Sequence, residues 1–319
     1  MLKNIGKRIL FSIVVLFALT FFVFLLSNMM SGNALDVVLQ GEGTISEEAY
    51  QALLHEMGLD LPIPVRYWNW LVDFLHGDMG TSTVNGQPVW SILKERIGPT
   101  LILTGSSLLI ALLISIPLGI MSAYKPYSFW DNFASALAFV GSSMPGFMIC
   151  LFGIYIFSVK LGWFPTSGMY YSNQPHTIRA LLEHLALPAI LCGLQMTGSL
   201  IKQTRSAVLE VMNEDYIKTA RSKGLSEFAV VIRHAFRNAL IPIITTISLS
   251  IPWLVGGAVI VEKIFSWPGM GSLIISSINS RDYNPIMGAT VIICTTVMVC
   301  NILLDILYTI IDPRLAKEK

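Results

Sequence analysis

Long stretches without a charged side chain recur along this chain and alternate with shorter polar segments. Six of these stretches have 18 or more residues, at 9–30, 98–124, 132–159, 184–201, 238–261 and 283–304. A helix needs about 20 apolar residues to cross roughly 30 Å of hydrocarbon. The pattern therefore predicts an all-α polytopic membrane protein with about six transmembrane helices. A hydrophobic content of 54% with only 13% charged residues agrees with this class.

The spans divide the chain into three parts. Residues 1–30 form the N-terminal end and the first span, residues 31–97 an outer loop domain, and residues 98–319 a transmembrane domain that contains a polar loop at 202–240. The first stretch follows basic residues, as a signal peptide does, but its apolar run is long and no A-x-A site follows, which favours an uncleaved span. With both termini inside, the inner segments hold fourteen of the 21 Lys and Arg residues, so the termini are predicted to be cytoplasmic.

The outer loop, residues 31–97, is acidic and carries two predicted helices. Ser46 precedes two glutamates and is expected to cap a short helix that stops at Gly58. Residues 66–75 place aromatic side chains at helical spacing, as is typical of the membrane–water interface. Two interpretations stay open for these aromatics: a cap that packs on the outer helix ends, or a contact with a ligand.

The polar loop is the most informative segment. Seven basic residues stand against four acidic ones between 202 and 237. A helix is predicted over 204–222, with Gly224 supplying the positive φ that ends it and Ser226 starting a second helix that runs into the fifth span. One face of the first helix is expected to hold Val208, Val211, Met212, Asp215 and Thr219. We interpret the segment as a docking element for a cytoplasmic motor; contact with anionic lipid explains its charge but not its helix–Gly–helix pattern.

The sequence gives little indication of catalysis, metal binding or nucleotide binding by this chain. The four cysteines lie in apolar spans, the five histidines are scattered, and no G-x-x-x-x-G-K-[ST] loop is present, so we predict no catalytic residue and no metal site. Asp305 lies within the last span. It is a candidate for a proton relay, or it lies near the inner interface and pairs with Arg314.

Several motifs in order along the chain carry a resemblance. The polar loop contains DYIKTARSKGL at 215–225, RHA at 233–235 and NALIP at 238–242. The others are GDMGTS at 77–82, PTL at 99–101, SMPGF at 143–147, PTSG at 165–168, FSWPGMG at 265–271, SRDY at 280–283, DILY at 305–308 and DPR at 312–314. Together they resemble the permease subunits of ABC importers in the dipeptide/oligopeptide/nickel permease family, of the dipeptide permease B type. The chain departs from the wider importer signature because Lys218, Thr219 and Ala220 stand where Glu-Ala-Ala is expected.

The resemblance implies a function and a set of partners. It implies a bacterial cytoplasmic-membrane permease that moves peptides by alternating access, or alternatively nickel or metal chelates, with no cofactor of its own. Its partners are a second permease subunit, two ATPase subunits that bind ATP and Mg²⁺, an extracytoplasmic binding protein and membrane lipid, with no nucleic acid. The residues implied in ATPase coupling are Asp215, Tyr216, Thr219, Ala220, Arg221, Lys223, Gly224 and Leu225. The acidic residues expected to face the binding protein are Glu42, Glu47, Glu48 and Asp60.

Two other classes of protein remain as rivals at this stage. A stand-alone secondary transporter or channel predicts buried charges in the spans or an inverted repeat of broken helices. An intramembrane enzyme requires a nucleophile–base pair or a metal cluster inside the spans. Neither pattern is clear in the sequence.

Overall fold

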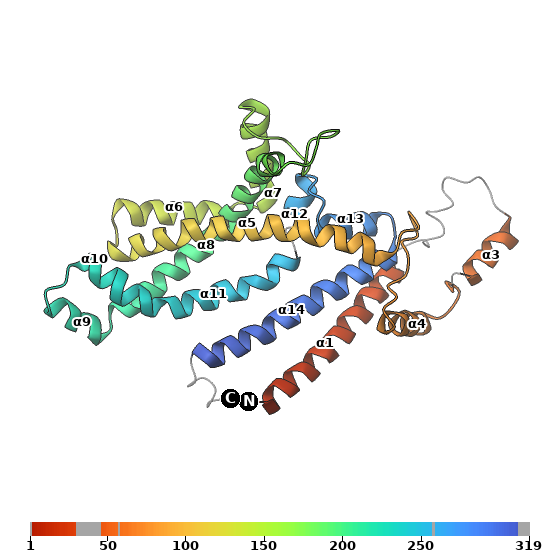
Figure 1. Ribbon diagram of the computed structural model, residues 1–319, viewed down its shortest axis with the longest axis horizontal. Coiled ribbons are helices and arrows are strands. Elements are labelled where there is room, and N and C mark those ends of the chain that lie inside the picture. Colours follow the sequence, from red (N-terminus) through yellow and green to blue (C-terminus); the bar gives the residue numbers. More distant parts are fainter. Residues whose placement is uncertain (1, 30–45, 57, 257–258, 312–319) are drawn as a thin grey trace. The chain divides into compact units, whose positions relative to one another are not determined.

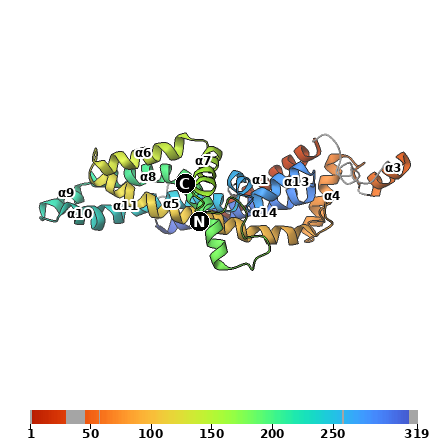
Figure 2. The same ribbon diagram turned by 90° about the horizontal axis from the view of Figure 1, so that it is seen from above.

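The structure, a computed structural model, describes residues 2–29, 46–56, 58–256 and 259–311 (Figures 1 and 2). Within these ranges every named element is a helix, and the one β-type contact is an isolated bridge between Thr81 and Pro88. The predicted all-α class is confirmed. Contacts group the chain into two units, Met1–Pro99 with Pro268–Ile302 and Thr100–Trp267 with Leu303–Lys319, which are described separately.

The first unit joins the N-terminal part of the chain to a segment near its C-terminus. It contains α1 (Leu2–Met29), α3 (Glu47–Glu56), α4 (Ile63–Leu75), the first turns of α5 (Val89–Tyr124), α13 (Met270–Asn279) and most of α14 (Tyr283–Ile311). The helix predicted after Ser46 is present, because the Ser46 hydroxyl accepts the Ala49 N–H at 3.3 Å and Gly58 has φ +62°.

Tyr67 of α4 fastens that helix to α1. Its ring is buried and meets Phe17, Phe21 and Phe24 edge-on, with centroid distances of 5.1–5.5 Å. The hydroxyl lies 2.8 Å from the hydroxyl of Thr20. Of the two interpretations of the aromatic segment, packing on a neighbouring helix therefore holds for Tyr67.

The second unit contains the remainder of α5 and the middle of the chain. Its elements are α6 (Phe129–Ser143), α7 (Gly146–Gly153), η1 (Ile154–Lys160), α8 (Ile178–Met212), α9 (Asp215–Ser222), α10 (Glu227–Ala229), η2 (Val230–Ala235), α11 (Phe236–Gly256) and α12 (Val259–Ile264). Glycines bring α6 and α8 together: a Cβ on Gly198 would lie 2.7 Å from the Ala138 carbonyl oxygen, and one on Gly141 would lie 2.7 Å from that of Leu194.

Four described helices are long and apolar enough to cross a membrane, in the segments Ile9–Met29, Val89–Tyr124, Ile178–Met212 and Tyr283–Leu303. The segment predicted as one span at 132–159 is sharply bent, because α6 and α7 with η1 meet at a bend of 104°. Pro145 disfavours a helical conformation at Met144, whose ψ is 134°. Counting the bent pair as one span gives five, so the expected number of six stays a prediction.

Two helices extend beyond the charge-free stretches that predicted them. α5 begins at Val89, before the predicted start at residue 98, and α8 continues to Met212, past residue 201. A charged side chain marks the end of a charge-free stretch in the sequence. It does not end the helix itself, because a helix can continue with polar residues once it has left the hydrocarbon. α11 and α12 cover the predicted fifth span on either side of residues 257–258, which lie outside the described ranges.

Candidate functional site

α9 begins after a break that the sequence pattern did not predict. α8 ends at Met212; Asn213 has φ −88° and ψ −8°, and Glu214 is extended, with ψ 149°. The amide of Asn213 donates to the Leu209 carbonyl at 3.1 Å, which closes the last turn of α8. The single helix expected over 204–222 is therefore wrong, and so is the face expected to join Val208 to Asp215 and Thr219.

A tight turn then reverses the chain at Gly224. Its φ is +78°, and its N–H donates to the Arg221 carbonyl at 2.9 Å, as expected for a glycine just past a helix end. Ser226 accepts the Ala229 N–H at 3.4 Å and starts a helical run from α10 through η2 into α11. This run continues past Pro242 to Gly256, in agreement with the predicted second helix that runs into the fifth span. We call residues 213–235 the α9–α10 hairpin; Figures 1 and 2 both show it projecting from the ends of α8 and α11.

The hairpin has a hydrophobic core of its own. Ile217 and Ala220 of α9 pack against Val230 and Ala235 of the returning helix, and all four are buried. Ala220, which the family resemblance placed among the coupling residues, thus faces inward. Its small side chain allows α9 to approach the returning helix, and it offers no surface to a partner.

The outward face of the hairpin combines apolar and charged groups. Tyr216 and Leu225 are each 42% exposed, and Phe228 is 66% exposed. Arg221 makes a two-pronged ion pair with Glu227, at 2.8 and 3.3 Å, and Lys218 pairs with Asp215 at 2.8 Å. The Asn238 amide donates to the Tyr216 hydroxyl at 2.8 Å, which fixes the orientation of the ring. Thr219, Lys223 and Gly224 are also exposed.

Phe228 was missed as a candidate residue. It is an exposed aromatic side chain that directly follows the polar pair Ser226 and Glu227, close in sequence to Leu225. Its position within a predicted helix concealed it, because a phenylalanine there is ordinarily part of the core. The signal was present in Ser226 and Glu227, the two polar residues just before it, because they mark the start of the second helix as exposed to solvent.

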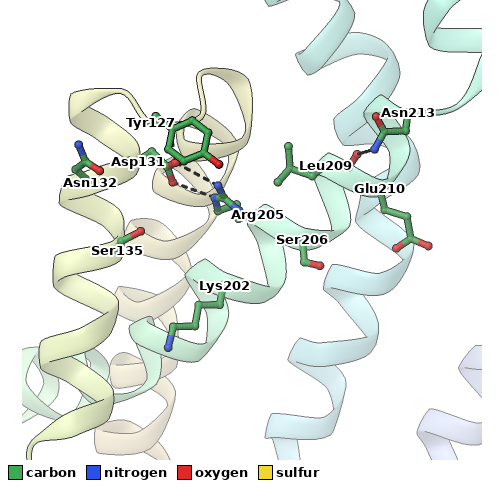
Figure 3. Close-up of a pocket in the computed structure, with 10 residues that line it drawn as sticks. All are labelled: Tyr127, Asp131, Asn132, Ser135, Lys202, Arg205, Ser206, Leu209, Glu210 and Asn213. Carbon is green, nitrogen blue, oxygen red and sulfur yellow. Dashed lines mark hydrogen bonds and ion pairs between the residues drawn. The ribbon is translucent and has the colours of Figure 1, made fainter.

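A buried ion pair holds the base of the hairpin to the rest of the unit. Arg205 of α8 donates through Nε to Asp131 Oδ1 at 2.9 Å and through Nη2 to Oδ2 at 3.2 Å (Figure 3). Asp131, at the start of α6, also accepts from the Ser122 hydroxyl and from the Tyr127 N–H at 2.8 Å. Arg205 Nε lies 3.0 Å from the Ser122 oxygen, so the ends of α5, α6 and α8 share one polar network.

A second polar network lies in the first unit. Asp282 is buried and accepts from the Ser82 hydroxyl and from the Thr83 N–H at 3.0 Å. The Asn284 amide donates to the Thr81 carbonyl at 2.7 Å. The GDMGTS and SRDY motifs, about 200 residues apart in the sequence, therefore meet in the structure, a contact that neither motif alone predicts.

The acidic residues expected to face a partner are placed as follows. Glu47 and Glu48 are exposed in the first turn of α3, and Glu42 lies outside the described residues. Asp60 is exposed but is bonded to the His55 ring at 2.7 Å, which raises the pKa of His55 and lowers that of Asp60.

Asp305 lies in α14, but its side chain and Arg314 are outside the described part, so the two interpretations of Asp305 both stand.

Comparisons with known proteins match this chain along almost its entire length. The family described as binding-protein-dependent transport system inner membrane component matches residues 115–317, and its N-terminal family matches residues 1–104. The oligopeptide transport system permease protein AppB of Bacillus subtilis and a putative peptide permease protein of Brucella suis are each 40% identical over 316 residues, covering 99% of each chain. The dipeptide transport system permease protein DppB of Escherichia coli is 34% identical over 340 residues, covering 100% of both chains.

A solved structure has a similar fold. The inward-facing MetNI methionine ABC transporter matches with a TM-score of 0.56 and 15% sequence identity, over 70% of this chain and 97% of that chain. The matched families together reach from residue 1 to residue 317. The chain belongs to the family of binding-protein-dependent transport system inner membrane components and is a permease subunit of an ABC transporter.

Proposed function

We propose that this permease subunit imports di- and oligopeptides across the cytoplasmic membrane, driven by ATP hydrolysis in separate subunits. The relatives described as peptide, oligopeptide and dipeptide permeases support the substrate class. The complete complex contains a second permease subunit, two ATPase subunits that bind ATP and Mg²⁺, and an extracytoplasmic binding protein. Both termini of this chain lie in the cytoplasm.

The α9–α10 hairpin is the observation that carries the proposal. Its exposed apolar side chains, Tyr216, Leu225 and Phe228, are large enough to fill a groove, and charged groups surround them. Interfaces of this composition place a few large anchors at the centre and a polar rim around them. Because Ile217 and Val230 form a buried core inside the hairpin, a force on its tip is passed to α8 and α11 with little internal deformation.

The outer face receives the binding protein in this proposal. Glu47 and Glu48 are exposed in α3 and meet a basic surface on that partner. Asp60 contributes less at neutral pH than its charge suggests, because its carboxylate is already bonded to His55. Such steering by exposed charges increases the association rate and fades with salt.

A co-purification experiment tests the docking assignment. Replacing Tyr216 and Leu225 together with alanine removes two exposed anchors without touching the hairpin core, and we expect a large loss of co-purifying ATPase. Lys218→Ala is the matched control, because its ion pair with Asp215 is exposed and contributes little. An unchanged ATPase yield in the double variant is incompatible with this docking surface.

A transport assay tests the substrate class separately. Vesicles containing the assembled complex are supplied with its binding protein and with either a labelled tripeptide or radioactive nickel. We expect ATP-dependent uptake of the peptide and none of free nickel. Uptake of nickel alone replaces the peptide assignment with the alternative of a metal importer.

A further inference from the structure

A cavity of about 710 Å³ opens beside the Asp131–Arg205 pair, between α6 and α8 (Figure 3). Its wall is almost entirely polar, and leucine is the one aliphatic residue in it. The residues that line it are Tyr127, Asp131, Asn132, Ser135, Lys202, Arg205, Ser206, Leu209, Glu210 and Asn213. The docking function uses none of these side chains directly, so the cavity needs an explanation of its own.

The ends of two apolar stretches indicate the level of the cavity relative to the membrane. Asp131 is the last charged residue before one stretch, and Lys202 is the first charged residue after another. Both walls of the cavity therefore lie at a membrane–water boundary, the level at which lipid headgroups are found. The same boundary carries three exposed aromatic residues at the start of α6, Phe129, Trp130 and Phe133. Phe129 and Phe133 are stacked, and Trp130 meets both of them edge-on. Aromatic side chains concentrate at this level in membrane proteins.

Two cationic groups in the cavity have capacity left for a ligand. Lys202 is exposed and has no carboxylate partner among the described residues. Arg205 uses Nε and Nη2 to hold Asp131, which leaves Nη1 without a partner in the described part of the chain. The two residues lie three positions apart on α8, hence on neighbouring parts of one helix surface, and Ser206 follows with a hydroxyl donor. Such a set of donors suits a phosphate group.

One anionic group complements them. Glu210 lines the same cavity five residues beyond Arg205, about 7.5 Å farther along the axis of α8. Its carboxylate is exposed and has no ion-pair partner within the described residues. A purely anionic ligand gains nothing from this carboxylate, whereas a ligand with a phosphate and a neighbouring ammonium satisfies both ends of the site.

We propose that this cavity binds the headgroup of a zwitterionic phospholipid with a primary ammonium, as in phosphatidylethanolamine. Lys202 and Arg205 hold the phosphate, the ammonium donates to Glu210, and the aromatic residues of α6 contact the start of the acyl chains. A quaternary ammonium has no N–H to donate, so phosphatidylcholine binds less well. Phosphatidylglycerol lacks the cation altogether. The site is independent of the transported substrate.

Lipid retention tests the proposal on the full-length chain with its co-purifying subunits. The complex is stripped in detergent and offered phosphatidylethanolamine, phosphatidylglycerol and phosphatidylcholine with identical acyl chains; bound lipid is counted by native mass spectrometry. Wild type is expected to retain phosphatidylethanolamine preferentially. Lys202→Gln removes a charge-assisted contact and is expected to reduce retention about tenfold. Glu210→Gln is expected to erase the preference over phosphatidylglycerol while lipid still binds.

Lys218→Gln, on the exposed face of α9, is the matched control and should bind like wild type. Equal retention of the three lipids overturns the proposal, as does a Lys202→Gln variant that behaves like the control. A preference that survives Glu210→Gln refutes the ammonium position. A tripeptide that occupies the cavity and is not displaced by phosphatidylethanolamine assigns the site to a peptide instead, because its termini carry the same pair of charges.

Discussion

Replacing Arg205 with methionine tests how strongly the buried ion pair holds the second unit together. The substitution keeps the length and apolar stem of the side chain and removes its two bonds to Asp131, at 2.9 and 3.2 Å. Asp131 is 5% exposed, so the variant leaves a largely buried carboxylate without its counter-ion. Ser122 and the Tyr127 N–H still donate to it, which offsets part of the loss.

The expected cost follows from how buried each partner is. Breaking a buried pair by removing one partner costs about 3–5 kcal/mol. The Arg205 side chain is 33% exposed, so water enters where the guanidinium was, and we expect a cost just below this range, about 2–3 kcal/mol. At about 2–4 °C per kcal/mol, the midpoint of thermal unfolding should fall by about 4–12 °C.

The assay is thermal unfolding of the purified protein in detergent, followed by tryptophan fluorescence. Arg221→Met is the matched control, because Arg221 also donates two hydrogen bonds to a carboxylate, that of Glu227. The side chains of this pair are 39% and 50% exposed, so it contributes at most about 1 kcal/mol. Combining Arg205→Met with Asp131→Asn removes the stranded charge and should recover part of the loss. Equal midpoints for the two arginine variants refute the assignment of a stabilising role to the buried pair.

Three other predictions follow from the geometry. Gly224→Val places a β-branched residue at φ +78°, which costs about 1–2 kcal/mol or more in backbone strain. Transport should therefore collapse while membrane insertion persists. Uptake should survive in Gly224→Asn, because asparagine tolerates this conformation. Gly198→Ala forces α8 away from α6 and should destabilise by about 1–3 kcal/mol in the same unfolding assay. Gly105→Ala should not destabilise, because beyond its own stretch of helix no atom lies within 4 Å of the new Cβ. The pKa of His55, measured by NMR titration, should lie above about 6.5 and return toward it in Asp60→Asn. The His55–Asp60 contact should therefore stabilise α3 fully between the ordinary pKa of an aspartate, about 3.9, and that of a histidine, about 6.5. The contribution should be lost as pH rises through the raised pKa of His55, and also as pH falls through the lowered pKa of Asp60.

The apolar stretches and the glycine signal predicted much of the fold. Charge-free runs located α1, α5, α8 and α14, because a span must avoid charge over its whole length. Gly224 was placed correctly at its turn, since few residues other than glycine adopt a positive φ. The break at Asn213 was missed because neither Asn213 nor Glu214 is a strong helix breaker, and the local pattern continued on both sides.

The two polar networks could not be predicted from local sequence. Asp131 and Arg205 are 74 residues apart, and charges at the end of a span are ordinarily explained by topology. Asp282 and Ser82 are separated by 200 residues. Each motif could be recognised by itself, but the contact between them depends on how distant helices pack, which periodicity does not specify.

The packing around the α9–α10 hairpin determines which helices move when a force is applied to the hairpin. Val211 and Met212, at the end of α8, pack against both the hairpin core and the cluster that joins α8 to α5 and α11. Rotation at the Asn213 break would have to separate these two residues and expose buried Ile217, whose burial alone is worth about 1.5–3 kcal/mol. Arg205, two turns earlier, ties the same end of α8 to the start of α6. The hairpin, the end of α8 and the start of α6 should therefore move as one rigid body, and flexibility must lie elsewhere, with the 104° bend at Pro145 as the first place to look for it.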